Sequence, residues 1–159
     1  MTSRDATDIP PVRDRLGYLL KHARARMATL TEEALRPFDI TGRELAVLTV
    51  LAESAPPSQL EAAQRLSIDR TSMVALIDLL EAKGLVERRP DPEDRRRNVV
   101  APTAAGRKTL DDASRASDEA ERAFLGPLAG ADGDRLRELL QAVLSTEAPI
   151  QPARRGREV

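Results

Sequence analysis

The 159-residue chain has no cysteine, no tryptophan and a single histidine. Without a thiol it can form neither a disulfide nor a thiolate metal site, and sensing of metals or peroxides through cysteine chemistry is excluded. One histidine is too few for a histidine-rich metal site. We therefore expect no bound metal and no cofactor.

Aromatic residues are also scarce, at 2% of the chain. The core of a domain of this length must then be built from aliphatic side chains, which suits packed helices. Long apolar runs are missing too, and residues 1–11 are polar and charged. Because no stretch approaches the length of a membrane span or signal peptide, we expect a cytoplasmic protein with no membrane partner.

The formal net charge of −1 hides an uneven distribution of charge. Residues 65–108 carry 10 basic and 7 acidic side chains, whereas residues 109–147 carry 4 and 9. A basic segment of this kind favours contact with phosphate, and an acidic one is repelled by it. Residues 65–108 are therefore the candidate surface for nucleic acid.

Two short helices are predicted at the start of this basic segment. Ser58 and Glu61 have the spacing of a capping box, which satisfies the free amides of a helix start. The apolar residues Leu60, Ala63 and Leu66 then recur at helical spacing. Asp69 offers a second N-cap only a few residues later, and the second helix ends at Gly84. Two helices joined by so short a turn form a helix-turn-helix.

The residue pattern after Gly84 changes to that of a β-hairpin. Residues 85–89 and 95–100 read as strands, and Pro90-Asp91-Pro92 begins the turn between them. Thr103 then caps the next helix. A helix-turn-helix followed by a hairpin with a basic tip is a winged helix.

Three stretches of this unit resemble the MarR (multiple antibiotic resistance regulator) family, with the family's spacing between them. They are residues 80–88 (LEAKGLVER), 91–96 (DPEDRR) and 103–106 (TAAG). The resemblance implies a sequence-specific, DNA-binding transcriptional regulator. It further implies a homodimer that binds double-stranded DNA at a pseudopalindromic promoter site, most simply as a ligand-responsive repressor, although activation stays open.

The second helix is the candidate reading helix. Its first turn carries Arg70, Thr71 and Ser72, whose polar groups can reach base edges and phosphates, although ordinary capping explains them too. Val74 and Ala75 stand where relatives more often have a polar residue and an arginine. Small apolar side chains there suit thymine methyl groups. Asp78, on the same helix, is expected to bond a neighbouring arginine.

The hairpin tip holds the arginine run. By the resemblance, Asp94 and Arg96 match the acidic and basic pair of the family's wing, in which the carboxylate orients the guanidinium for the minor groove. Arg95 and Arg97 are expected to contact phosphates. The alternative is a solvated charge run, which is the usual explanation of such a triplet.

Long helices are predicted on both sides of the winged helix. The stripe of apolar residues from residue 12 is longer than a small domain needs internally, which indicates a partner subunit. The fold class is thus mainly α (α+β). We expect a mobile arm (1–11), one MarR-like domain (12–146) and a disordered tail (147–159), with dimerisation helices at 12–36 and 104–146 around a winged helix-turn-helix at 41–103.

A pocket for a small effector is implied by the resemblance, where the first helix meets the helices that follow Thr41 and Thr103. His22, Arg26 and Arg43 could supply its polar groups to a phenolic or anionic ligand. An enzyme is not expected, because no nucleophile motif, phosphate loop or metal spacing is present. A winged helix that only binds proteins remains the alternative, since fold does not fix function.

Overall fold

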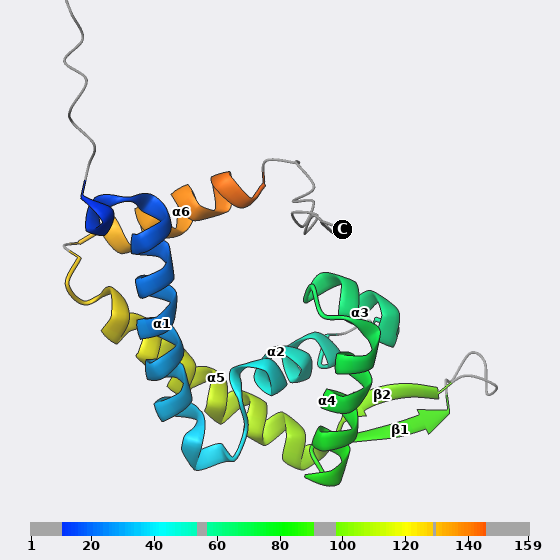
Figure 1. Ribbon diagram of the computed structural model, residues 1–159. Helices are drawn as coiled ribbons and strands as arrows, with labels where there is room; N and C mark the ends of the chain where they lie inside the picture. The colour runs from blue at the N-terminus through cyan, green and yellow to red at the C-terminus, as the bar shows by residue number, and fades with distance from the viewer. Residues whose placement is uncertain (1–10, 54–56, 91–97, 129, 146–159) are drawn as a thin grey trace, which may run out of the picture. The chain divides into compact units, whose positions relative to one another are not determined.

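The structure is a computed structural model that describes residues 11–53, 57–90, 98–128 and 130–145, and most of these residues are helical (Figure 1). By its internal contacts the chain divides into two units, Met1–Phe124 and Leu125–Val159. The mainly helical winged-helix architecture predicted from the sequence is confirmed. Among the described residues, no helix has both the length and the apolar composition needed to span a bilayer.

The first long helix, α1 (Leu16–Leu35), is shorter than predicted. A 3₁₀ turn at Val12–Asp14 precedes it, and the extended backbone of Arg15 separates the two. After α1 a second 3₁₀ turn, Arg36–Phe38, contains Pro37, and Asp39 closes it in the left-handed conformation with φ of 52°. Of the α1 residues only Leu35 is buried, so most of the apolar stripe is not used inside the first unit.

Each of the next three helices begins at the predicted N-cap. Thr41 and Glu44 form a complete capping box at the start of α2 (Gly42–Leu51). Ser58 and Glu61 form another at α3 (Gln59–Arg65), and Asp69 caps α4 (Arg70–Ala82). Such caps satisfy backbone amides that would otherwise lack a partner at a helix start, and so they define where the short helices begin.

The core lies between α2, α3, α4 and the hairpin, and it is aliphatic as expected. Its fully buried large side chains are Leu35, Val47, Leu48, Leu51, Met73, Ile77, Leu80 and Val86. Of the apolar residues of α3 that recur at helical spacing, Ala63 is buried, whereas 57% of Leu60 is exposed. The buried face of α3 is formed by Ala62 and Ala63 instead, and their small side chains let this short helix approach its neighbours closely.

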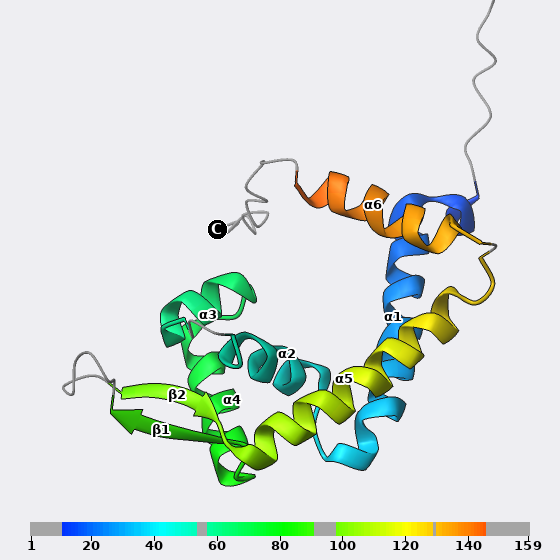
Figure 2. The ribbon, with the colours of Figure 1, turned by 180° about the vertical axis from the view of Figure 1, so that it is seen from behind.

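The hairpin consists of β1 (Val86–Pro90) and β2 (Asn98–Pro102), which pair in antiparallel register with Val86 opposite Pro102. Figure 2 shows the pair extending from the base of α4. Val86 and Val100 anchor the hairpin in the core. The returning strand was predicted to start at Arg95, and residues 91–97 lie outside the described residues.

The start of α5 (Ala104–Leu125) closes the base of the hairpin. Thr103 accepts a hydrogen bond from the amide of Gly106 at 3.0 Å, and its hydroxyl donates to the carbonyl of Gly84 at 2.7 Å. The left-handed φ of 69° at Gly84 turns the chain from α4 toward β1. In the second unit α6 spans Asp132–Leu144.

Gly106 provides the sharpest test of this packing. A Cβ atom added to it would lie 1.8 Å from the carbonyl oxygen of Leu85, which is backbone and cannot rotate away. Although alanine is normally the better helix former, Gly106→Ala should destabilise the fold by about 1–3 kcal/mol or more through overpacking. Thermal unfolding followed by circular dichroism measures this.

Gly17→Ala is the matched control, because a Cβ at Gly17 in α1 meets no atom within 4 Å. That variant should keep or raise the melting temperature. If both variants unfold at the wild-type temperature, α5 does not approach Leu85 as closely as described.

Candidate nucleic-acid interface and ligand hollow

The first turn of α4 is held by the carboxylate of Asp69. It accepts hydrogen bonds from the Ser72 amide at 2.9 Å and the Ser72 hydroxyl at 2.6 Å. The hydrogen bonds from Ser72 lower the pKa of Asp69, because they favour its ionised form. The hydroxyl of Ser72, predicted as a DNA contact, is therefore already engaged in the cap.

One face of α4 stays open to solvent while the opposite face enters the core. Arg70, Thr71 and Ala75 are exposed, and Val74 is 37% exposed. These residues recur three and four positions apart, so the predicted contact residues gather on one side of the helix. The structure thus brings four of the five predicted α4 residues to an accessible surface.

Arg88 on β1 ties the hairpin to α4. Its guanidinium bonds the carboxylates of Asp78 and Glu81, which lie three residues apart on α4. The expectation that Asp78 pairs with an arginine is confirmed, and its negative charge is balanced before any phosphate approaches. The pairing also fixes the direction in which the hairpin leaves the helix.

The four predicted wing contacts, Asp94, Arg95, Arg96 and Arg97, lie outside the described residues. What the structure does give is the hairpin that carries them. The β1–β2 pair is in register from Val86 to Pro90, and its last described pair is Pro90 with Asn98.

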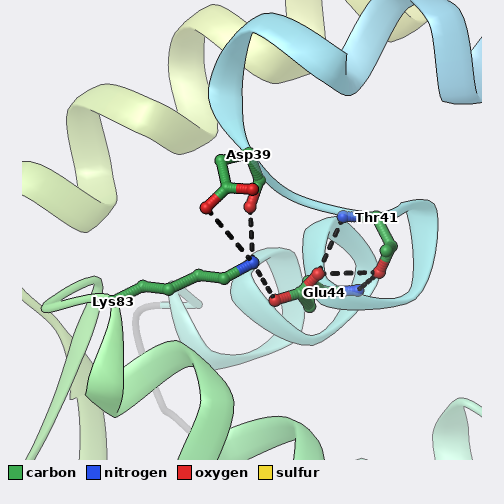
Figure 3. A network of polar contacts seen from close by, with 4 residues as sticks. All are labelled: Asp39, Thr41, Glu44 and Lys83. Carbon is green, nitrogen blue, oxygen red and sulfur yellow. Dashed lines mark hydrogen bonds and ion pairs between the residues drawn. The ribbon is translucent and has the colours of Figure 1, made fainter.

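A buried polar network joins α2 to the other end of α4 (Figure 3). The side chain of Glu44 is only 4% exposed, and it accepts a bond of 2.7 Å from Lys83, the C-cap residue of α4. Burial alone would raise the pKa of Glu44, but hydrogen bonds from Lys83 and Thr41 outweigh it, and the pKa is lowered. Glu44 is thus a buried anion with its partners in place.

A hollow of about 620 Å³ lies between α1 and the start of α2. Arg24, Met27, Ala28, Thr31 and Glu32 line it from α1, and Thr41, Gly42 and Arg43 line it from α2. The mixture of two guanidinium groups with apolar surface suits an organic anion.

Of the three residues predicted for an effector pocket, Arg43 lines this hollow. His22 packs against Tyr18 with ring centroids 4.1 Å apart, and Arg26 is exposed on α1. Arg24 lines the hollow from α1, where His22 and Arg26 were predicted. Helical spacing from Met27 and Thr31 would have pointed to Arg24, since residues three, four and seven apart share a face.

The sequence and the structure were compared with known proteins. The model of the MarR family matches residues 38–97, which run from the end of the second 3₁₀ turn to the hairpin tip. The chain is 34% identical over 91 residues to the multiple antibiotic resistance protein MarR of Escherichia coli, covering 57% of this chain and 63% of that protein. It is 29% identical over 100 residues to the transcriptional repressor NicR of Pseudomonas putida, covering 63% of each chain.

Among solved structures, CouR of Rhodococcus jostii superposes with a TM-score of 0.74 at 29% identity when bound to p-coumaroyl-CoA, with 87% of this chain and 97% of CouR covered. CouR bound to a 23-mer DNA duplex gives a TM-score of 0.76 over 87% of this chain and 99% of that one. Sequence motifs, capped helices, hairpin and superposition agree: residues 38–97 match the MarR family, and the chain is similar to MarR-family regulators over most of its length.

Proposed function

We propose that the chain is a sequence-specific DNA-binding transcriptional regulator that acts as a homodimer and whose DNA binding responds to a small ligand. The observation that carries the proposal is the capped helix α4, which presents an exposed first turn, followed by the β1–β2 hairpin, in a chain whose residues 38–97 match the MarR family. It acts by binding, not by catalysis. Since DNA is its partner, we expect it in the cytoplasm.

Helix α4 reads bases in the major groove. Arg70 and Thr71 reach phosphates and base edges from the exposed first turn, and Ser72 holds that turn in shape through Asp69. Val74 and Ala75 offer only methyl groups at the centre of the exposed face. They suit thymine methyls and give no hydrogen-bond readout, so the operator should prefer A·T pairs at the positions they meet.

The hairpin tip adds a second set of contacts. Arg96 enters the minor groove with Asp94 fixing its side chain, and Arg95 and Arg97 contact phosphates. The ion pairs of Arg88 with Asp78 and Glu81 support this arrangement, because they hold the base of the hairpin against the reading helix.

The ligand occupies the hollow between α1 and α2. Arg24 and Arg43 bind its negative charge, and Met27 and Ala28 contact its apolar body. CouR, which binds p-coumaroyl-CoA, gives a precedent for an organic acid or its thioester. In the simplest case the protein represses a promoter by occupying it. The ligand then stabilises a form of the dimer in which the spacing of the two α4 helices does not match the operator. Such a shift requires that the two forms bind the ligand with different affinity.

Self-association is proposed from apolar side chains of α1 and α6 that the described residues leave exposed. On α1 the exposed large side chains are Leu16 (70% exposed), Leu19 (51%), Leu20 (45%) and Tyr18 (40%). On α6 they are Leu139, Leu140, Val143 and Leu144. Apolar rows of this length on two separate helices are typical of an interface between subunits.

Replacement of Leu16 and Leu19 by glutamate should therefore weaken the dimer, because two charges per subunit would be buried against apolar surface. Sedimentation equilibrium at micromolar concentration measures the association. The wild type should sediment as a dimer and the double variant as a folded monomer. A stable wild-type monomer would rule out the proposed architecture.

Arg96→Ala should weaken operator binding by about 1–3 kcal/mol, the range for a specific contact. Asp94→Ala should cost less, and in a double-mutant cycle the two losses should not add, because the residues share one interaction. Arg95→Ala or Arg97→Ala should lower affinity for all sequences alike and flatten the salt dependence through lost counterion release. Mobility shift with the DNA flanking the protein's own gene measures each variant.

The alternative, a winged helix that binds only proteins, makes the opposite prediction for the same assay. All four variants would then behave alike, and the wild type would show no preference for that DNA over an unrelated duplex. An Arg96→Ala dimer with unchanged affinity and sequence preference would also show that the tip does not read DNA.

A further inference from the structure

The carboxylate of Glu44 divides its two oxygens between two helices (Figure 3). Oε2 accepts bonds from the Thr41 amide at 2.8 Å and from the Thr41 hydroxyl at 2.9 Å, and so caps α2. Oε1 accepts the bond of 2.7 Å from Nζ of Lys83 at the end of α4. A buried carboxylate in this arrangement cannot move toward one helix without changing its bonds to the other.

Lys83 makes a further bond that reaches the connection from α1. Its ammonium group donates to the backbone carbonyl of Asp39, the residue in the left-handed conformation just before α2. Lys83 therefore bonds both the carbonyl of Asp39, at the end of the 3₁₀ turn, and the carboxylate of Glu44, in the first turn of α2. Both lie more than thirty residues away from it in sequence, as the separations of 44 and 39 residues show.

The same first turn of α2 forms one wall of the hollow. Thr41, Gly42 and Arg43 line it, and Thr41 is the residue whose amide and hydroxyl bond Glu44. Gly42 lies 3.6 Å, measured from an ideal Cβ position, from the methyl group of Thr31 on the opposite wall. A molecule bound against this wall of the hollow therefore contacts the turn whose amide and hydroxyl bond Glu44.

We propose that Glu44 is a positioning residue that joins the hollow to the reading helix, and that its bond to Lys83 transmits occupancy of the hollow to the C-terminal end of α4. The proposal rests on the proposed function for its biological meaning, but the coupling itself requires no DNA. Charge-assisted hydrogen bonds in a buried site are strong and directional. A displacement of Glu44 should therefore move Lys83 as well, whereas the partners of a surface ion pair could separate instead.

The coupling is distinguished from ordinary support of the fold by a substitution in the hollow. Ala28 lines the hollow from α1, is exposed, and has no part in the network. In the full-length protein without DNA, Ala28→Phe places a ring in the hollow and should change hydrogen–deuterium exchange of the Lys83, Gly84 and Leu85 amides about tenfold, the scale set by one charged hydrogen bond. These amides close the last turn of α4 through bonds to Leu79, Glu81 and Leu80.

The change in hydrogen–deuterium exchange caused by Ala28→Phe should disappear when the bond between Lys83 and Glu44 is removed. In a Lys83→Met background, Ala28→Phe should leave exchange at the end of α4 unchanged, whereas in a Lys83→Arg background, which keeps the charge and the donors, the response should return. Lys108→Met is the matched control, because Lys108 pairs with Asp112 at 2.6 Å on the surface of α5. The response to Ala28→Phe should be the same there as in the wild type.

If Lys83→Met does not fold, Glu44→Gln replaces it, since the amide still accepts a bond from Thr41 but loses the charge, and it should reduce the response. Two results would overturn the proposal: no response to Ala28→Phe in the wild type, or an equal response with and without Lys83. Failure of the proposed function is seen separately, as absence of DNA binding by the wild type in a mobility shift.

Discussion

A buried carboxylate must have all its hydrogen bonds made inside the protein, and this constraint on Glu44 organises the first unit. Its partners are the start of α2 and the end of α4, so satisfying one charge fixes two helices relative to each other. The end of α4 then determines where Gly84 turns the chain into β1, and Arg88 on β1 bonds back to α4. The orientation of the reading helix and that of the hairpin therefore follow from one short network.

The features that the sequence predicted well are those whose cause is local. Thr41, Ser58 and Asp69 cap their helices through bonds to residues three positions away, so each helix start can be predicted from four consecutive residues. Gly84 ends α4 because only glycine tolerates a positive φ at little cost, which is again a property of one residue. Helical spacing predicted the exposed face of α4. The order of the helix caps, the helix-ending glycine and the hairpin pattern along the chain predicted the winged helix.

The remaining features depend on contacts between residues far apart in sequence. Leu60 matched the helical spacing of a core residue, but the close packing of α3 selected Ala62 and Ala63 instead. The bond between Glu44 and Lys83 joins residues 39 positions apart, so the sequence around either residue does not predict it. Helical spacing places Arg24 on one face of α1 with Met27 and Thr31, but which face of α1 meets α2 depends on contacts between the two helices, so Arg24 was missed in the hollow. The roles of residues 94–97 stay predictions, since the described residues end on either side of them.

The central claim is that two copies of α4 read DNA bases at a fixed separation, and hydroxyl-radical footprinting of the wild-type protein on the DNA flanking its own gene tests it most directly. We expect two protected half-sites one helical turn apart, roughly 34 to 36 Å between centres, with further protection in the flanking minor grooves if Arg96 enters them. Uniform protection that does not depend on sequence, or a single short protected half-site, would contradict it.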